Sequence, residues 1–262
     1  MGRREFIKRG TLWVTGAATF NIFVPTLIRA QTQMLLNPVL AGRGGNGWTP
    51  KTPGNLVEWL KADAITGYTS GQTLPTWTAS YGLDATGSSG SQPTYATNVR
   101  NGLPAVNFAA GSLQELITGT FETPIGLPAT VMMSFQMIGS LGGNEQYMFN
   151  GGPSTNCIQI QEYAGNWYIW GPWELATPLP DTNWHILTVI FASSAVQYGF
   201  DTGSLTTGAG CPGFTDPSST FNFGYPSYGA PGFNLGEVCV WNAALSASDI
   251  TNGYNYMSGK WA

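Results

Sequence analysis

Short apolar runs recur along the chain and are separated by clusters of turn-forming residues. Aromatic and β-branched residues dominate the runs, and Gly, Pro, Asn and Asp fill the gaps. Such residues favour pleated, half-buried strands, and many short strands in succession indicate a sandwich or a barrel. We therefore predict an all-β fold of roughly a dozen strands. The expected strands include residues 130–137, 156–161, 166–170, 185–191, 195–200, 221–225 and 236–241.

Two stretches have a pattern that fits a helix. Residues 56–64 are short and fit either a helix or a strand. Residues 246–257 begin at Ser246, whose hydroxyl can cap a helix, and Asp249 follows three residues later, where the helix dipole favours a carboxylate. The sequence therefore predicts one short C-terminal helix.

The N-terminal part of the chain breaks with the strand pattern. Residues 11–28 form an apolar stretch without charges, just long enough to span a membrane. Pro25 and many Thr, Ala and Gly residues argue against a membrane anchor, and the small residue Ala30 follows where a signal peptide would be cleaved. Residues 31–54 show neither a strand nor a helix period and hold many Gly and Pro residues. We expect them to form a linker or arm.

The composition suits an extracellular β protein. Hydrophobic residues make up 42% of the chain, but charged residues only 9%, against about 25% in an average soluble domain. Half of the basic residues lie within residues 1–30, so the rest of the chain is acidic overall. A nucleic-acid partner needs a basic surface that displaces counterions, and the body of this chain lacks one. We therefore expect no nucleic-acid partner.

The three cysteines cannot all pair within one chain. Cys239 lies in the apolar run 236–241, where a free thiol is expected to be buried and to pack as a small hydrophobe. Cys157 and Cys211 lie near the ends of expected strands or loops. An oxidising compartment would allow these two to pair, and the sequence leaves that pairing open.

Two adjacent arginines stand near the N-terminus, followed by an aromatic residue, an aliphatic residue and a lysine. This order resembles the twin-arginine export signal of bacteria, although Gly2 replaces the Ser or Thr that often precedes the arginines. The matching residues are Arg3, Arg4, Phe6, Ile7 and Lys8. The resemblance implies that residues 1–30 are a signal peptide and that a bacterial cell exports the folded protein to the periplasm, the cell surface or the medium.

Several phrases follow one another in a characteristic order along the rest of the chain. They include residues 56–63 (LVEWLKAD), 101–108 (NGLPAVNF), 184–187 (WHIL) and 236–241 (GEVCVW). In this order they resemble the laminin-G-like jelly-roll family, also called the concanavalin A-like lectin/glucanase family. The resemblance extends over residues 55–262.

The family resemblance implies a two-sheet antiparallel β-sandwich, a jelly roll of the concanavalin A-like kind, with Trp and Phe side chains as core anchors. It implies one domain over residues 55–262, with a short C-terminal helix. The family includes lectins, adhesion modules, enzymes and spacers, so the fold does not determine the function.

Catalytic carboxylates are not visible as a pattern in any single strand. Glycoside hydrolysis needs two carboxylates about 5–9.5 Å apart, and residues i and i+2 of a strand share a face. The acidic residues, such as Glu115 and Glu122, are instead isolated along the sequence. His185 is expected to be a partly buried, hydrogen-bonded strand residue rather than a catalytic base. We therefore expect no catalytic residues and no enzyme.

Calcium is the cofactor that the family resemblance leaves open. Domains of this type often bind Ca²⁺ at one rim through Asp, Asn and carbonyl oxygens. The same side chains also initiate turns, which explains them without a metal. The candidate ligands are Asp201, Asp216 and Asn222.

Surplus aromatic residues mark the expected contact surface. Alternation along residues 166–170 places aromatics on both faces of the strand, which is more than one core needs. A second aromatic group lies in the Gly- and Pro-rich loop 225–232. Packing in the core or over a sheet edge would explain each of these residues as well. The predicted ligand-binding residues are Trp167, Trp170, Trp173, Tyr225 and Tyr228.

Three functions are compatible with the sequence. The first is an exported module without catalytic activity that binds a glycan or another cell-surface partner, and whose mature chain has no membrane span. The second is a structural subunit that self-assembles into a surface layer, filament or appendage, with residues 31–54 reaching a neighbour. The third is a glycan-active enzyme whose carboxylates come from different strands.

Overall fold

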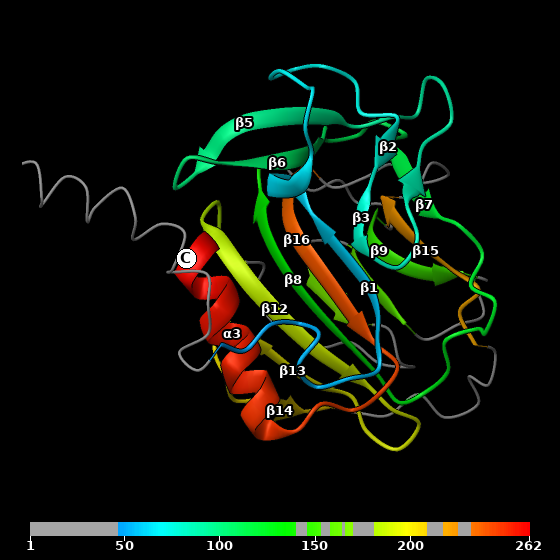
Figure 1. Ribbon diagram of the computed structural model, residues 1–262, viewed down its shortest axis with the longest axis vertical. Coiled ribbons are helices and arrows are strands. Elements are labelled where there is room, and N and C mark those ends of the chain that lie inside the picture. Colours follow the sequence, from blue (N-terminus) through cyan, green and yellow to red (C-terminus); the bar gives the residue numbers. More distant parts are fainter. Residues whose placement is uncertain are drawn as a thin grey trace, which may run out of the picture. The chain divides into compact units, whose positions relative to one another are not determined.

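Two antiparallel sheets pack face to face, and one helix covers the outer face of the larger sheet (Figure 1). The computed structural model describes residues 47–139, 146–152, 158–163, 166–169, 181–208, 217–224 and 232–262. All of them belong to one compact unit, Arg43–Ala262. The predicted all-β sandwich with a C-terminal helix is confirmed.

The larger sheet has nine strands, in the order β14-β13-β12-β8-β16-β1-β3, and β6 extends it by pairing with β16 on one side and β5 on the other. The longest pairings join β8 to both β12 and β16. The strands are β1 (Leu56–Lys61), β3 (Ala79–Tyr81), β5 (Thr94–Arg100), β6 (Leu103–Phe108), β8 (Ala129–Met137), β12 (Trp184–Phe191), β13 (Gln197–Phe200), β14 (Thr206–Thr207) and β16 (Phe233–Trp241).

The smaller sheet has seven strands, in the order β11-β10-β9-β15-β7-β4-β2. It is strongly non-sequential, since β15 inserts between β9 and β7. The strands are β2 (Thr76–Trp77), β4 (Ala85–Thr86), β7 (Glu115–Thr118), β9 (Gln146–Gly152), β10 (Gln159–Tyr163), β11 (Asn166–Ile169) and β15 (Thr220–Gly224).

The main core lies between the two sheets. Alternate side chains of β12, such as Leu187 and Val189, meet Phe149, Phe221 and Phe223 from the smaller sheet in one buried cluster. The Phe149 and Phe223 rings have their centroids 5.6 Å apart. Each ring in such a core contributes a large buried area, which explains why aromatic residues dominate the runs in the sequence.

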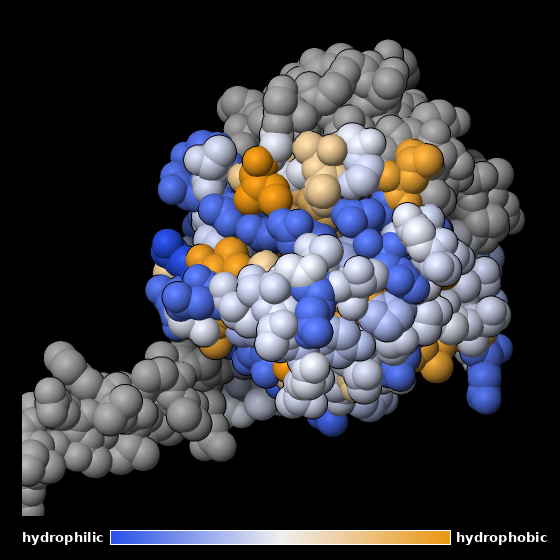
Figure 2. Space-filling view, turned by 90° about the horizontal axis from the view of Figure 1, so that it is seen from above, coloured by the Kyte–Doolittle hydropathy of each residue, from blue (hydrophilic) through white to orange (hydrophobic). Residues whose placement is uncertain are grey.

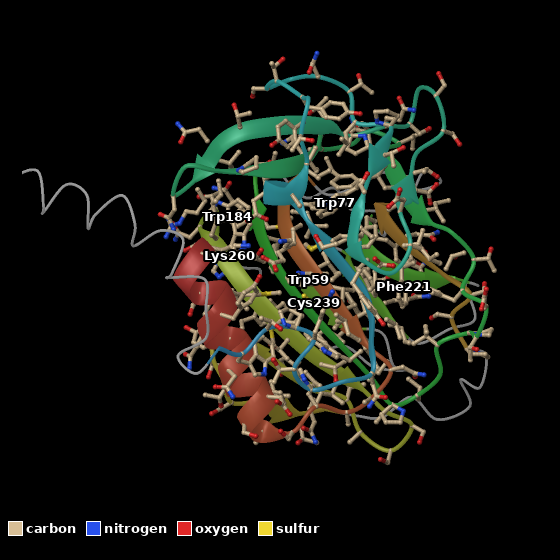
Figure 3. All side chains as sticks on the ribbon, in the orientation of Figure 1. Trp59, Trp77, Trp184, Phe221, Cys239 and Lys260 are labelled. Carbon is tan, nitrogen blue, oxygen red and sulfur yellow. The ribbon has the colours of Figure 1, made fainter. Side chains whose placement is uncertain are left out.

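A second core lies on the opposite face of the larger sheet, under helix α3 (Ala247–Trp261). Trp184 and Trp261 stack there with ring centroids 4.9 Å apart, and Figure 3 shows Trp184 and Cys239 near this helix. Both faces of the larger sheet are covered. As a result, eight of the nine residues of β8 and all nine residues of β16 are buried. These strands are therefore mainly apolar along their whole length, without the alternation of a strand that has one exposed face.

The sequence located most elements within a few residues. The helix begins after Ser246, whose hydroxyl accepts a hydrogen bond from the Asp249 backbone N–H, as predicted. Residues 56–64 are β1 followed by a single 3₁₀ turn, η1 (Ala62–Ala64), so the strand alternative holds. Cys239 is a free, buried thiol, which confirms the prediction, whereas Cys157 and Cys211 lie outside the described residues.

Part of the segment expected to be a linker contacts the domain. Trp48 is buried in the second core, and the Pro50 carbonyl accepts a hydrogen bond from the Trp241 indole at 2.8 Å. Residues 1–46 lie outside the described residues, so the signal-peptide and linker boundaries stay predictions. Within the described part of the chain, no helix is long and apolar enough to cross a membrane.

Candidate functional site: the polar outer face of the smaller sheet

The smaller sheet directs apolar side chains inward and mostly polar side chains outward. In β15, Phe221 and Phe223 enter the main core, so Asn222 between them lies on the outer face. In β10, Ile160 enters the core, which places Gln159 and Gln161 outside. This follows from the two-residue period of a strand.

The outward residues of six strands align in one row across the sheet. Each is the Cα partner of the next, so their side chains are neighbours. Asn222 pairs with Ile117 on one side and with Asn150 on the other, and Asn150 in turn pairs with Gln159. In order from β2 to β10, the row is Thr76, Thr86, Ile117, Asn222, Asn150 and Gln159.

A second, shorter row flanks the first at the β9–β11 end. Gln161 pairs with Tyr147 on β9 and with Tyr168 on β11, so an amide stands between two aromatic residues. A shift of register between Ile160 and Gln161 keeps Tyr147 on the outer face while Met148 and Phe149 both enter the core. We call the two rows together with Glu115 the polar face.

Two amide oxygens on the polar face have no bond within the protein. Asn150 is 4% exposed and Gln161 is 2% exposed, yet neither Asn150 Oδ1 nor Gln161 Oε1 has a hydrogen-bond partner. Buried polar atoms are normally bonded, and an unbonded one costs roughly 1–3 kcal/mol. Because both residues are almost fully buried, these oxygens can accept a hydrogen bond from a buried water molecule, and a ligand hydroxyl reaches them only if the face opens.

Glu115 is the charged group on this face with a described side chain. Its Oε1 accepts a hydrogen bond from Asn222 Nδ2 at 3.3 Å. Burial raises the pKa of Glu115 to about 7, although the bond from Asn222 acts in the opposite direction. The carboxyl group therefore exchanges its proton near neutral pH, and it can act as a donor or an acceptor there.

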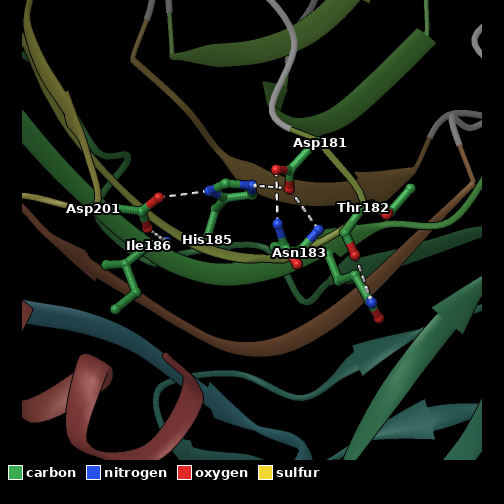
Figure 4. Close-up of polar contacts among 7 residues, drawn as sticks. Asp181, Thr182, Asn183, His185, Ile186 and Asp201 are labelled. Atoms are coloured by element: carbon green, nitrogen blue, oxygen red, sulfur yellow. Dashed lines mark hydrogen bonds and ion pairs between the residues drawn. The ribbon is translucent and has the colours of Figure 1, made fainter.

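A second polar cluster surrounds His185 at the start of β12 (Figure 4). His185 Nδ1 lies 2.5 Å from Asp201 Oδ2, and Nε2 lies 3.2 Å from Asp181 Oδ1. The hydrogen bond with Asp201, followed by the charges of the two carboxylates, raises the pKa of His185 despite its partial burial. Both ring nitrogens face carboxylate oxygens, so the two aspartates hold the imidazole ring in place. The expectation of a partly buried, hydrogen-bonded histidine is confirmed.

Most of the predicted ligand-binding aromatics lie outside the described residues: Trp170, Trp173, Tyr225 and Tyr228. Trp167 belongs to β11, but its side chain is not described. The two described side chains of β11 point to opposite faces of the sheet, as the alternation of a strand requires. Ile169 joins the main core, and Tyr168 lies on the polar face. The aromatic prediction stays a prediction, and the described part of β11 adds Tyr168 to it.

The calcium candidates have other partners. Asp201 has a positive φ of 51° and uses both carboxylate oxygens, one for His185 and one for the Ile186 backbone N–H. Asn222 lies in the other sheet, bonded to Glu115, and Asp216 lies outside the described residues. In the described part of the chain, no group of three or more His, Cys, Asp or Glu side chains is arranged for a metal. Calcium binding stays a prediction.

Sequence reasoning missed most of the polar face. The alternation in residues 156–161 was visible, but it could not show that Gln159 and Gln161 lie beside Asn150 and Asn222, which are distant in sequence. That alignment depends on the insertion of β15 between β9 and β7. The sequence contained one signal for the polar face, because amide side chains occupy the polar positions of the predicted strands.

No family model matches the chain, and no curated protein matches it significantly. Solved structures resemble it at the level of the fold. The binding domain of botulinum neurotoxin DC, in complex with rat synaptotagmin II, has a TM-score of 0.56 at 8% identity, covering 77% of this chain and 51% of that one. Trypanosoma rangeli sialidase in complex with sialic acid has a TM-score of 0.52 at 16% identity, covering 78% and 33%.

A mutant of that sialidase displaying trans-sialidase activity is a further neighbour, with a TM-score of 0.54 at 14% identity, covering 79% of this chain and 34% of that one. The present chain therefore spans about half the length of the toxin domains and a third of the sialidases. At these identities the likeness shows the β-sandwich fold alone. The laminin-G-like and twin-arginine resemblances stay predictions.

The sialidase neighbours contradict the prediction that the chain is not an enzyme, because enzymes are among the proteins that share this fold. That prediction rested on a search for carboxylates within single strands. A site can also be assembled from strands that are distant in sequence. Glu115, an isolated carboxylate in the sequence, lies on the polar face beside Asn222 and has a pKa of about 7.

Proposed function

We propose that the protein is an exported binding module, and that the polar face of the smaller sheet contacts a glycan or another partner at the cell surface. The observation that carries this proposal is the row of aligned amide side chains with two unbonded buried oxygens. Amides donate and accept hydrogen bonds side by side, which suits the hydroxyl groups of a sugar.

The flanking aromatics support the same kind of ligand. Tyr147 and Tyr168 stand on either side of Gln161, and an aromatic ring presents an apolar body with a polar tip. Such a ring can pack against the apolar face of a sugar while the neighbouring amide bonds to its hydroxyl groups. By contrast, the surface visible in Figure 2 carries apolar residues only in small separate groups, which gives no large apolar docking surface there.

Export is supported by the arginine pair and the apolar stretch at the N-terminus. An exported β-sandwich with few charges is suited to contacts outside the cell. The intact mass of the protein purified from its source tests this part: a chain that starts near Gln31 supports export, and a chain that retains Met1 contradicts cleavage.

Binding to a glycan array, with the full chain, tests the proposal. We expect binding to at least one glycan and a loss of about tenfold or more in affinity for Gln161→Ala and for Asn222→Ala, equivalent to about 1.4 kcal/mol. Gln197→Ala is the matched control, because Gln197 is exposed on β13 of the other sheet. Thermal melting checks that each variant is folded.

Two results would count against the proposal. If Gln161→Ala and Asn222→Ala both still bind the glycan, the contact surface lies elsewhere. If the protein binds no glycan on the array, its partner is not a glycan. Chromatography of the glycans after incubation also detects cleavage. Products that Glu115→Gln abolishes would make the polar face a catalytic site.

A further inference from the structure

We infer that the ligand of the polar face is electrically neutral, an uncharged hydroxyl-rich saccharide rather than a sialylated, sulfated or uronate-containing one. This inference rests on the proposed function and specifies its ligand. It comes from the distribution of cationic side chains in the sequence and the structure.

The smaller sheet lies in a part of the chain that has almost no cations. Between Lys61 and Lys260 the sequence contains a single Lys or Arg, which is Arg100. All seven strands of the smaller sheet, and the segments that connect them, fall within this stretch. Arg100 itself ends β5, in the larger sheet.

The described cations gather instead around the larger sheet and α3. Lys61 lies over the Trp59 ring, 4.8 Å from its centroid, and Arg100 Nε donates to the Trp261 carbonyl at 3.1 Å. Lys260 contacts Glu237, and Lys51 lies over the ring of Tyr81 in β3. In Figure 3, Lys260 lies at the C-terminal end of α3, and Phe221 of the smaller sheet lies on the other side of the domain.

The histidine does not supply the missing charge. His185 belongs to β12 of the larger sheet, and both of its ring nitrogens face carboxylates, those of Asp181 and Asp201. Both of its ring nitrogens are therefore already engaged within their own cluster. Among the described residues, the polar face holds amides, hydroxyls, two tyrosines, Ile117 and the carboxyl group of Glu115.

An anionic ligand would be poorly compensated on such a face. A carboxylate or sulfate that leaves water needs a cation or several strong donors, and arginine is the usual partner because it binds both oxygens at once. Glu115 would add repulsion once its proton has left. Neutral hydroxyl groups, in contrast, form their hydrogen bonds with amide donors and acceptors at no such cost.

The test compares neutral and acidic forms of one ligand on the full-length protein. The strongest neutral glycan from the array is oxidised at its primary alcohol to the uronate, and both forms are titrated at pH 8 in low and high salt. We expect the uronate to bind at least tenfold more weakly. We also expect binding of the neutral form to change less than twofold with salt, because no charge pair is screened.

A charge-removing variant identifies the source of the discrimination. Glu115→Gln should bind the uronate more tightly than the wild type does. The difference in affinity between the neutral form and the uronate should therefore become smaller. Glu122→Gln, in an exposed loop of the same stretch, is the matched control and should leave this difference unchanged.

The outcomes separate the inference from the proposed function. The protein could instead prefer sialylated, sulfated or cationic ligands, with binding that depends on salt and is lost in Gln161→Ala. That result would show that the ligand is charged, and it would leave the polar face as the binding site. Equal binding of the neutral and uronate forms would also overturn neutrality. Absence of all glycan binding would overturn the proposed function and this inference with it.

Discussion

At the scale of single residues, Glu58 is the clearest case of a side chain whose environment changes its chemistry. It lies on β1, is fully buried, and accepts hydrogen bonds from the backbone N–H groups of Leu83 and Trp59. Burial raises its pKa to about 8, because the two hydrogen bonds do not replace the lost hydration. Glu58 is therefore protonated in the folded protein at neutral pH.

This predicts a stability that falls with rising pH. The unfolded chain releases the Glu58 proton near the ordinary pKa of 4.5, and the folded protein only near 8, so the folded state binds the extra proton between these values. The free energy of unfolding should drop by roughly 2–5 kcal/mol from about pH 5 to about pH 8. Urea denaturation at several pH values measures this drop.

Glu58→Gln should flatten the pH dependence, because the amide does not titrate. Glu115, whose pKa is raised in the same direction, will leave a smaller slope. Glu122→Gln, at an exposed position, should keep the wild-type slope and serves as the control. A slope that is equally steep in Glu58→Gln and in the wild type would contradict this account of Glu58.

His185 provides a second prediction at this scale. Its hydrogen bond with Asp201 is the largest cause of its raised pKa, and the contact with Asp181 is longer and more exposed. The titration of the imidazole by NMR should therefore give a pKa above the ordinary 6.5. Asp201→Asn should lower it more than Asp181→Asn does, and the reverse order would refute the assignment.

The sequence predicts the environment of some single residues and not of others. The burial of Cys239 and the capping role of Ser246 depend on a few sequence neighbours, so they were predictable. The raised pKa values of Glu58 and Glu115 were not, because they depend on strands and loops that are distant in sequence. Glu58, for example, meets the backbone of Leu83.

At the scale of elements, one buried carboxylate holds α3 on the larger sheet. Glu237 of β16 is fully buried and accepts hydrogen bonds from Trp59 Nε1, Tyr256 Oη and Lys260 Nζ at 2.7, 2.8 and 2.6 Å. Lys260 also pairs with Asp63 at 3.1 Å. Burial alone would lower the pKa of Lys260, but the charges of Glu237 and Asp63 outweigh it and raise that pKa.

Lys260→Met should therefore destabilise the protein strongly. The variant leaves the Glu237 carboxylate buried without a cation, which typically costs about 3–5 kcal/mol. Lys61→Met removes only a contact between a partly exposed lysine and the Trp59 ring, so it should cost no more than about 1 kcal/mol. Chemical denaturation of both variants measures the difference, and similar losses would show that the buried pair contributes little.

The strands and the helix were largely predictable from the sequence, but the pairing of the strands with one another was not. Runs such as β8, β12 and β16 are apolar enough to be recognised as strands from the sequence alone. An Asn-Gly pair is a typical sequence signal for a hairpin turn, and Asn101-Gly102 between β5 and β6 has positive φ at both residues, as a tight turn requires. The insertion of β15 between β9 and β7 has no local signature, because it depends on long-range packing.

At the scale of the whole molecule, the two outer faces have different chemistry. The outer face of the larger sheet is mainly apolar around the buried Glu237, is covered by α3, and has the described cations around it. The outer face of the smaller sheet is polar, and the seven strands of that sheet contain no Lys or Arg. The sequence predicted the sandwich, but this difference between faces emerges only once the strand order is known.

We propose that the polar face of the smaller sheet binds the ligand. Amide hydrogen exchange of the full-length protein, with and without the neutral oligosaccharide found on the array, tests it most directly. We predict increased protection in β7, β9, β10 and β15, with α3 and β16 unchanged, since slower exchange reports local stabilisation by the ligand. Protection confined to α3 and β1, with none in β9 and β10, would contradict the claim.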